Sequence, residues 1–490
     1  MKAGIVVAAI LLVLLVSGTS AADDGYKIVQ VSEYCRHGAR TTWYTPNLNL
    51  DLTQKYGIGI LTPNGMRMHY LLGAQIRKNY ESLFGTVEDN KVTFKDIEVF
   101  ASAKARSELS AVSQMTGLFP FGLGSEVSTP DQAKYFSPPF ANFSVKVKGN
   151  DALPKKFYPI PISINDQAKD MLFFGSYADS CPAANAYSKQ WNQGEYKKYD
   201  YLIQDLAKEL EVNGFSAKKM YNLDKWDINQ LALFSDEIMT YENYHGKKYM
   251  DMDDKLFEKV FHAHNVKFTS EFNNSNICRM RADGVARGII EGMDAFVNGN
   301  KDKKMFRFYS GHDTGVFAHM LLLGLSNLQC LIDMLQQKPV QGLCEYIPGF
   351  ASQFLYELSQ KDDKYYVRVL WNGKPFEVCK DKVQCPYDEF KTVYSEKVFM
   401  GTDDFIDFCG NKYLIAQRSQ HPKTIIEPFP LWIIILVGLF IIIALTGLNL
   451  WKYKQINKTI SYGMPHESMY ENAITIRQNP IEAFNAGLPA

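Results

Sequence analysis

Two arginines and a histidine stand close together in the segment Arg36–Arg40, which reads Arg-His-Gly-Ala-Arg. A guanidinium presents a rigid fork of N–H donors that matches the oxygens of a phosphate group. The neutral imidazole of His37, between Arg36 and Arg40, has the lone pair needed to attack an electron-poor phosphorus. A solvated basic loop is the alternative for two arginines alone. The histidine and glycine between them, after an apolar segment, favour phosphoryl chemistry.

Two other polar clusters also follow segments that are typical of strands. The stretch Ser102–Ser107, which contains a lysine and an arginine, comes after the predicted strand Ile97–Phe100. The stretch Gly311–Thr314 (Gly-His-Asp-Thr) comes after the predicted strand Met305–Tyr309. Ligands of open α/β sheets bind outside the carboxyl ends of the strands. The three clusters are therefore expected to converge on one site.

These motifs resemble those of the histidine acid phosphatases, the branch of the histidine phosphatase superfamily that includes prostatic and lysosomal acid phosphatases and phytases. The family signature Arg-His-Gly-x-Arg, at the end of the first strand, is reproduced by Arg36–Arg40. The late His-Asp pair of the family is matched by His312 and Asp313, and its third arginine by Arg106. The resemblance runs from about Tyr26 to Cys409.

The resemblance implies a role for each matched residue. His37 would be the nucleophile that forms a phosphohistidine, and Asp313 would protonate the leaving oxygen. Phosphoryl transfer spreads negative charge over three equatorial oxygens, so fixed cations can replace a metal ion. The chain is therefore expected to need no metal and no cofactor. The phosphate would be held by four further side chains, Arg36, Arg40, Arg106 and His312.

All eight cysteines lie between two apolar runs of the chain, Ile5–Val16 and Leu431–Leu450. Disulfides can persist in this part of the chain if it is exported. The resemblance implies the bonds Cys181–Cys409 and Cys379–Cys385. A third bond, Cys330–Cys344, would be peculiar to this chain. The two remaining residues, Cys35 and Cys278, are expected to be buried free thiols.

The order of predicted elements indicates an α/β fold with a mainly parallel central sheet flanked by helices. Between about residues 150 and 295 the apolar periodicity is helical, which predicts a helical cap inserted into a phosphatase domain of residues 22–428. The segment Phe354–Val378 alternates apolar and polar residues around Asp-Asp and Asn-Gly dipeptides. Such dipeptides favour tight hairpins, so late antiparallel strands are expected.

Apolar runs near the two ends predict export and membrane anchoring. Lys2, the apolar stretch Ile5–Val16 and the small residues after it have the order of a signal peptide, expected to span residues 1–21. The run Leu431–Leu450 has no charge and is long enough for one transmembrane helix. Lysines follow it, so residues 451–490 are expected in the cytosol.

This topology predicts a single-pass type I membrane protein at the cell surface or in lysosomes or endosomes. The catalytic domain would then be lumenal or extracellular. Asn142 and Asn273 stand in Asn-x-Ser sequons of that domain and are expected to carry glycans.

The charge balance narrows the range of partners. The chain has 53 Lys and Arg residues against 53 Asp and Glu residues, so no overall field favours nucleic acid. The sequence therefore predicts an acid phosphatase that hydrolyses small phosphate monoesters outside the cytosol. A catalytically inactive, ligand-binding ectodomain and a phosphatase specialised for inositol or lipid phosphates are the alternatives. Formation of a homodimer is left open.

Overall fold

The computed structural model describes residues 25–43, 50–86, 91–120, 151–167, 169–173, 181–420 and 444–454. The chain divides into two compact units, residues 1–417 and 418–490. The predicted signal peptide and Asn142 lie outside the described residues. Residues 431–443 of the predicted membrane span also lie outside them, and residues 444–454 form a helix. None of the helices described is both long and apolar enough to cross a membrane.

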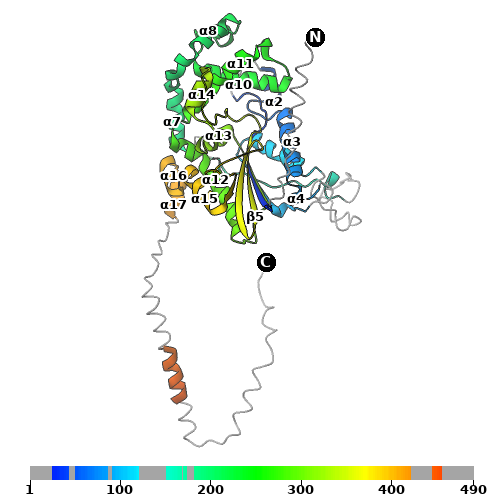
Figure 1. The fold of residues 1–490 in the computed structure, drawn as a ribbon, viewed down its shortest axis with the longest axis vertical. Helices are drawn as coiled ribbons and strands as arrows, with labels where there is room; N and C mark the ends of the chain where they lie inside the picture. The colour runs from blue at the N-terminus through cyan, green and yellow to red at the C-terminus, as the bar shows by residue number, and fades with distance from the viewer. Residues whose placement is uncertain are drawn as a thin grey trace, which may run out of the picture. The chain divides into compact units, whose positions relative to one another are not determined.

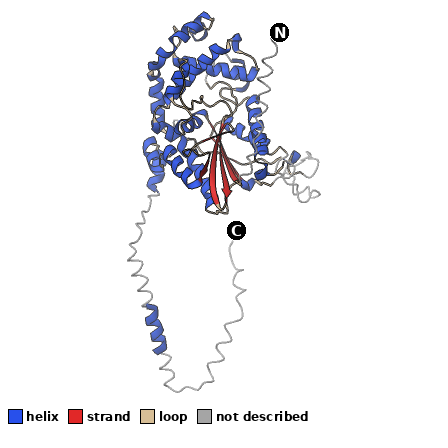
Figure 2. Cartoon of the chain, in the orientation of Figure 1, coloured by secondary structure: helices blue, strands red, loops and turns tan. Residues whose placement is uncertain are grey.

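A sheet of eight strands forms the centre of the first unit, in the order β3-β2-β4-β1-β5-β6-β7 with β8 beside β6. Figure 2 shows the strands gathered beneath a region made of helices. The strands are β1 (Lys27–Arg36), β2 (Ile97–Ala101), β3 (Ile162–Ser163), β4 (Phe306–Gly311), β5 (Gln353–Lys361), β6 (Lys364–Trp371), β7 (Lys374–Phe376) and β8 (Gln384–Pro386).

The sheet is mixed, so the prediction of a mainly parallel sheet is wrong. Strands β1 to β4 pair in parallel, whereas β5 pairs antiparallel with β1 and the later strands continue antiparallel. The predicted turn residues Asp362, Asp363, Asn372 and Gly373 all have positive φ angles, as tight hairpins require. The late hairpins therefore form as expected, but they extend the central sheet.

Helices cover both faces of the sheet (Figure 1). On one face, Val31, Phe306 and Leu355 pack with the helices α3 (Pro63–Asn79), α4 (Glu81–Phe84) and α5 (Ala105–Leu118). On the other face, Tyr34 and Phe354 pack with α12 (Ser275–Val297), α13 (Asp313–Leu322) and α15 (Tyr387–Val398). Alternate residues of β1 and β5 thus enter different cores, as the two-residue period of a strand requires.

The helical cap lies beyond the end of the sheet at which β1 and β4 finish (Figure 1). The segment predicted as helical is helical from Pro182 onward, whereas Ile162–Ser163 is the edge strand β3. The cap elements are α7 (Pro182–Asn192), η5 (Glu195–Ile203), α8 (Gln204–Val212), α9 (Ala217–Tyr221), α10 (Ile228–His245), η6 (Tyr249–Asp251) and α11 (Asp254–Glu271). The remaining elements are α2 (Leu50–Tyr56), η2 (Phe94–Asp96), η3 (Pro154–Lys156), α14 (Leu328–Leu335), α16 (Thr402–Cys409) and α17 (Lys412–Gln420).

Candidate active site

The three polar clusters meet at the carboxyl ends of neighbouring parallel strands. Strand β1 ends at Arg36, which lies opposite Gly311 at the end of β4. On the other side of β4, Ala101 of β2 lies opposite Ser310. The turn after β2 leads directly into α5, whose second residue is Arg106. The sheet therefore brings together side chains that are far apart in the sequence.

His37 is a neutral imidazole whose ring is oriented by a hydrogen bond at Nδ1. Its backbone N–H donates to the Gly311 carbonyl at 3.0 Å. Its Nδ1 lies 2.8 Å from the Gly38 carbonyl, which can only accept, so Nδ1 carries the proton and Nε2 carries the lone pair. Burial, followed by the positive charges of Arg106 and Arg36, lowers the pKa of His37 well below its ordinary value. The ring is therefore unprotonated even in weakly acidic solution.

The glycine of the signature allows a close approach between the catalytic loop and α3. A Cβ atom at Gly38 would lie 2.4 Å from the backbone oxygen of Gly65, near the start of that helix. Backbone at this distance cannot move aside as a flexible side chain can. The position therefore requires glycine for steric reasons.

Gly38→Ala is expected to destabilise the protein by about 3 kcal/mol, since the added methyl group overpacks a backbone contact. Denaturant unfolding and turnover of p-nitrophenyl phosphate measure the effect. Gly349→Ala is the matched control, because its Cβ would meet only the Ser352 hydroxyl, at 3.7 Å. Equal stability of the two variants would show that the approach of Gly38 to Gly65 does not constrain the loop.

Arg36 links the signature to Asp313. Its Nη2 lies 2.7 Å from the Asp313 carboxylate, and its guanidinium lies 4.5 Å from the centre of the Phe350 ring. Burial by itself would raise the pKa of Asp313, but the charges of Arg36 and Arg40 hold it down to about 2. Asp313 is therefore ionised in the free site, and it needs a change in its surroundings before it can act as an acid.

Arg40 is paired with a carboxylate from the cap. Its Nη1 and Nη2 each donate to one oxygen of Asp236 at 3.1 Å. Asp236 is buried and belongs to α10, nearly two hundred residues from Arg40. Sequence reasoning missed it. Its signal in the sequence is the acidic pair Asp236-Glu237 inside the otherwise largely apolar helical stretch Leu231–Met239.

His312 is oriented by a chain of hydrogen bonds. Arg106, which can only donate, lies 3.3 Å from Nδ1 of His312, so Nε2 carries the proton and donates to the Ser102 hydroxyl at 2.7 Å. Ser102 in turn donates to Ser107 at 3.0 Å. The rings of His312 and His37 lie edge to face with centroids 5.4 Å apart. Ser102 and Ser107 thus set the tautomer of a histidine beside the expected nucleophile.

These side chains line one cavity of about 580 Å³, and residues of the cap helices α7, α10 and α11 form part of its walls. All six expected catalytic and phosphate-binding residues are among its walls: Arg36, His37, Arg40, Arg106, His312 and Asp313. His264 of α11 also lines it, whereas its neighbour His262 stacks on Tyr346. The two histidines of that pair therefore have separate environments.

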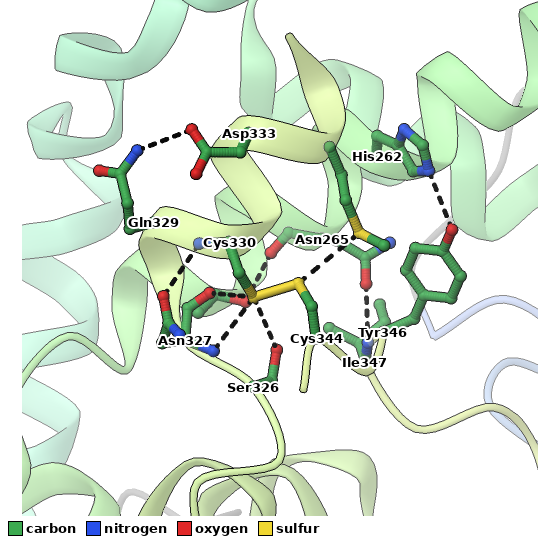
Figure 3. Close-up of a disulfide and its surroundings, with 12 residues drawn as sticks. His262, Asn265, Ser326, Asn327, Gln329, Cys330, Asp333, Cys344, Tyr346 and Ile347 are labelled. Atoms are coloured by element: carbon green, nitrogen blue, oxygen red, sulfur yellow. Dashed lines mark hydrogen bonds between the residues drawn. A yellow bond between two sulfur atoms is a disulfide. The ribbon is translucent and has the colours of Figure 1, made fainter. Parts of the chain in front are cut away.

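A disulfide, shown with its surroundings in Figure 3, lies just before the loop that contacts Arg36. Cys330 of α14 is bonded to Cys344, and the chain continues to Ile347, whose N–H donates to Asn265 of α11 at 2.7 Å. Two residues that follow contact Arg36: the Pro348 carbonyl accepts a hydrogen bond from its Nη1 at 2.5 Å, and the Phe350 ring lies against its guanidinium. The bond therefore limits the movement of a loop that positions an arginine of the site.

The double variant Cys330→Ala with Cys344→Ala is expected to lose about 3 kcal/mol of stability, because the bond closes a short loop in the unfolded chain. It is also expected to raise KM, since the Arg36 contacts loosen. Unfolding by denaturant and steady-state kinetics measure the two effects. Removing the Cys379–Cys385 bond is the control, and a KM increase of equal size there would exclude a specific role for the first bond.

The other cysteines also match the expectations. Disulfides join Cys181 to Cys409 and Cys379 to Cys385, and the buried thiols Cys35 and Cys278 are free in the described chain. Among the described residues, the group with three possible metal ligands in reach of one another contains the Cys379–Cys385 disulfide, which offers no thiolate.

Of the two sequons in the predicted domain, the structure describes the one at Asn273. Its asparagine is exposed, between α11 and α12. The position is therefore accessible, and its glycosylation stays a prediction.

Comparison with known proteins identifies the family. The model of the histidine phosphatase superfamily (branch 2) matches residues 27–372, and the chain belongs to this superfamily. It is 22% identical to prostatic acid phosphatase of Bos taurus over 375 residues, which is 74% of this chain and 82% of that protein. The prostatic acid phosphatase of Rattus norvegicus is also 22% identical, over 72% of this chain and 82% of the rat protein.

Among solved structures, Hafnia alvei phytase in complex with tartrate matches with a TM-score of 0.50 and 14% identity. The match covers 77% of this chain and 98% of the phytase chain, and it supports the fold. Membership of the superfamily supports phosphatase activity for this chain.

Proposed function

We propose that the chain is an acid phosphatase that hydrolyses phosphate monoesters through a phosphohistidine intermediate on His37. The observation that carries this proposal is the oriented lone pair of a neutral, buried His37 in a cavity that Arg36, Arg40 and Arg106 also line. The names of the curated relatives, prostatic acid phosphatases, support an acid phosphatase among the possible phosphatases.

In the first step, His37 Nε2 attacks the phosphorus, so that the N–P bond forms and the bond from phosphorus to the ester oxygen breaks. Asp313 donates a proton to the departing oxygen. In the second step, a water molecule attacks the phosphorus of the phosphohistidine and transfers a proton to Asp313. The new O–P bond forms as the N–P bond breaks, and the electron pair of that bond returns to Nε2 of His37. The products are inorganic phosphate and the neutral imidazole. The arginines neutralise the charge on the equatorial oxygens throughout.

Two of the arginines form ion pairs with carboxylates in the free site. Arg36 pairs with Asp313, and Arg40 pairs with Asp236. A bound phosphate competes with both carboxylates for the guanidiniums and adds negative charge beside Asp313. Both effects raise the pKa of Asp313 from its low value in the free site, so substrate binding favours the protonated acid.

The test is turnover of a panel of phosphate monoesters by the purified full-length chain at acidic and neutral pH, with and without EDTA. We expect hydrolysis that is fastest below neutral pH and resists EDTA. An inactive ectodomain would hydrolyse none of the esters while still binding phosphate. Loss of activity in EDTA would point to a metal-dependent mechanism in place of the proposed one.

We also propose that the chain is a type I membrane protein with its catalytic unit outside the cytosol. The support is in the sequence: the order of charged, apolar and small residues near Met1, the uncharged run Leu431–Leu450 and the lysines after it. Glycosidase digestion and protease protection of the expressed chain test this topology. Glycans on Asn273 would agree with it. Cleavage of the catalytic unit by a protease added to the cytosolic side of intact membranes would contradict it.

A further inference from the structure

Glu33 is a buried acidic residue that the hydrolysis steps above do not use. It lies on β1, three residues before Arg36, and it is fully buried. Side chains alternate along a strand, so Glu33 points to the same face of the sheet as Val31 and Cys35. Those two residues belong to the core that α3, α4 and α5 cover. A glutamate in such a core needs either an ionic partner or a bound proton.

An amide binds one oxygen of the Glu33 carboxyl. Gln114 of α5 donates from Nε2 to Oε2 of Glu33, and its own Oε1 lies 2.8 Å from Nδ1 of His69 on α3. An amide oxygen can only accept, so Nδ1 of His69 is the donor. Oε1 of Glu33 and Nε2 of His69 have no hydrogen-bond partner among the described residues. An ionised Glu33 would therefore leave a charged oxygen buried without a donor, which is costly.

A second glutamate on the same face shows what an ionised carboxyl requires there. Glu357 of β5 lies opposite Val31, two residues before Glu33. It accepts a hydrogen bond from the Tyr80 hydroxyl at 2.7 Å and pairs with the guanidinium of Arg368. Arg368 is therefore already neutralised by Glu357. Among the described residues, no ion pair includes Glu33.

The titratable groups around Glu33 supply no positive charge in neutral or weakly acidic solution. Burial raises the pKa of Cys35 on β1 and of Tyr80 after α3, so both are neutral. Burial lowers the pKa of His69 to about 4, so its ring is neutral as well. Glu33 thus has uncharged neighbours on β1 and α3.

The charged and polar groups of the other elements do not compensate a charge on Glu33 either. Arg77 of α3 donates to the Leu118 carbonyl at 3.1 Å and to the Thr86 carbonyl. The buried residues of α5 are all uncharged, and those of β4 in this core are phenylalanines. Burial therefore raises the pKa of Glu33 well above its ordinary value, and the hydrogen bond from Gln114 offsets this only in part.

Glu33 lies at the junction of β1, α3 and α5, which holds the catalytic loop. Strand β1 leads directly into that loop, and α5, which contains Gln114, begins beside the second polar cluster. Helix α3 contains both His69 and Gly65, and Gly65 packs against Gly38 of the loop. Loosening of the contacts around Glu33 would therefore displace elements that position the catalytic loop.

We propose that Glu33 is a pH-sensitive element of the fold: it is protonated in acidic solution, and its ionisation at higher pH destabilises the junction of β1, α3 and α5. The proton exchanges with solvent, so no other reactant takes part. The inference concerns the stability of the catalytic unit. It goes beyond the proposed phosphatase function and does not depend on it.

The direction of the effect follows from proton linkage. The folded chain binds the Glu33 proton more tightly than the unfolded chain does, so this group stabilises the fold most below about pH 4. The contribution is lost as the pH rises toward the raised pKa of Glu33 in the folded chain. Buried histidines such as His69 act in the opposite direction, because a lowered pKa weakens the fold as the pH falls below about 6.5. The effect of Glu33 must therefore be measured as a difference between variants.

The experiment is denaturant unfolding of the full-length chain and of its Glu33→Gln variant from about pH 4.5 to about pH 8. Glutamine keeps the size of the side chain and cannot ionise, so a constant cost of the amide cancels when the difference is followed against pH. We expect the unfolding equilibrium constant of the parent, relative to that of the variant, to rise by about tenfold or more across this range, because one pKa unit corresponds to a factor of ten.

Glu357→Gln is the matched control, because it removes a carboxyl of the same face that has a cationic partner. It is expected to be less stable than the parent, and a rise in pH should not relieve this loss. A constant ratio between the parent and Glu33→Gln over the whole pH range would overturn the proposal, as would an equal pH dependence for Glu357→Gln.

Glu33→Met gives the same comparison if Glu33→Gln is poorly folded. If neither variant folds, infrared spectra of the parent labelled with carbon-13 glutamate decide the question. A band of protonated glutamic acid that persists at about pH 6.5, well above the ordinary pKa of the residue, supports the proposal. Absence of that band contradicts it. Each of these measurements gives an answer whether or not the chain hydrolyses phosphate esters.

Discussion

His37→Ala is expected to lower kcat by about 10⁴-fold or more, with little change in the free energy of unfolding. Nδ1 of His37 donates to the Gly38 carbonyl, so its Nε2 keeps the lone pair that attacks phosphorus. Arginine has no lone pair to offer, and the Nδ1 lone pair of His312 already accepts from Arg106. Steady-state kinetics and denaturant unfolding measure the two quantities.

A chemical trap distinguishes this role from simple phosphate binding. Rapid quenching of the parent chain with labelled substrate should yield a phosphoenzyme that is labile in acid and stable in base, as expected for phosphohistidine. His37→Ala should yield none. His245→Ala is the matched control, because His245 lies at the end of α10 and does not line the cavity. Retained turnover in His37→Ala, or an acid-stable phosphoenzyme, would contradict the assignment.

Asp313→Asn is expected to lower kcat by about 10²–10⁴-fold for alkyl phosphates, whose leaving groups need a proton. The loss should be much smaller for p-nitrophenyl phosphate, because nitrophenolate leaves without protonation. Asparagine keeps the size of the side chain, so the comparison isolates the proton. Equal losses on the two esters would show that Asp313 positions Arg36 and does not act as the acid.

The pH dependence gives a second signature of Asp313. Its pKa is about 2 in the free site, so the carboxyl is protonated there only in strong acid. Bound phosphate raises that pKa, and the fraction of protonated acid then falls as the pH rises through the new value. For the parent acting on alkyl phosphates, kcat should therefore decrease from acidic toward alkaline pH. With Asp313→Asn and p-nitrophenyl phosphate, this decrease should disappear.

His37 should not limit activity at the acid side until the pH is low. Its pKa is lowered by burial and by the neighbouring arginines, so the imidazole stays unprotonated at pH values below the ordinary pKa of histidine. The acidic range in which Asp313 can carry a proton in the complex therefore overlaps the range in which His37 is free to attack. An acid optimum follows from these two opposite requirements.

The family and the positions of the expected chemistry could be predicted from the sequence because they depend on local order. Arg36–Arg40 is contiguous, and each of the other two clusters follows its strand within a few residues. Once three strands are parallel neighbours, their carboxyl ends meet whatever the rest of the fold does. The hairpin turns were equally predictable, because Asn372-Gly373 favours one turn geometry by itself.

The order of strands depended on contacts that no local pattern records. Alternation in Phe354–Val378 predicts strands, but it does not say which edge they join. Pairing of β5 with β1 makes the central sheet mixed. That choice is made by side chains such as Phe354, which pack into the same core as Tyr34. The direction of a sheet pair is thus a property of tertiary packing.

The sequence by itself therefore determined the signature, the His-Asp pair and the family, because their spacing along the chain carries the information. Only the tertiary structure decided which distant groups surround them. Asp236 reaches Arg40, and Lys267 and Arg281 enter the cavity, because of how α10, α11 and α12 are rotated and docked. A helix of unknown rotation can direct the same residue to solvent or to a site, so charge and spacing could not reveal these positions.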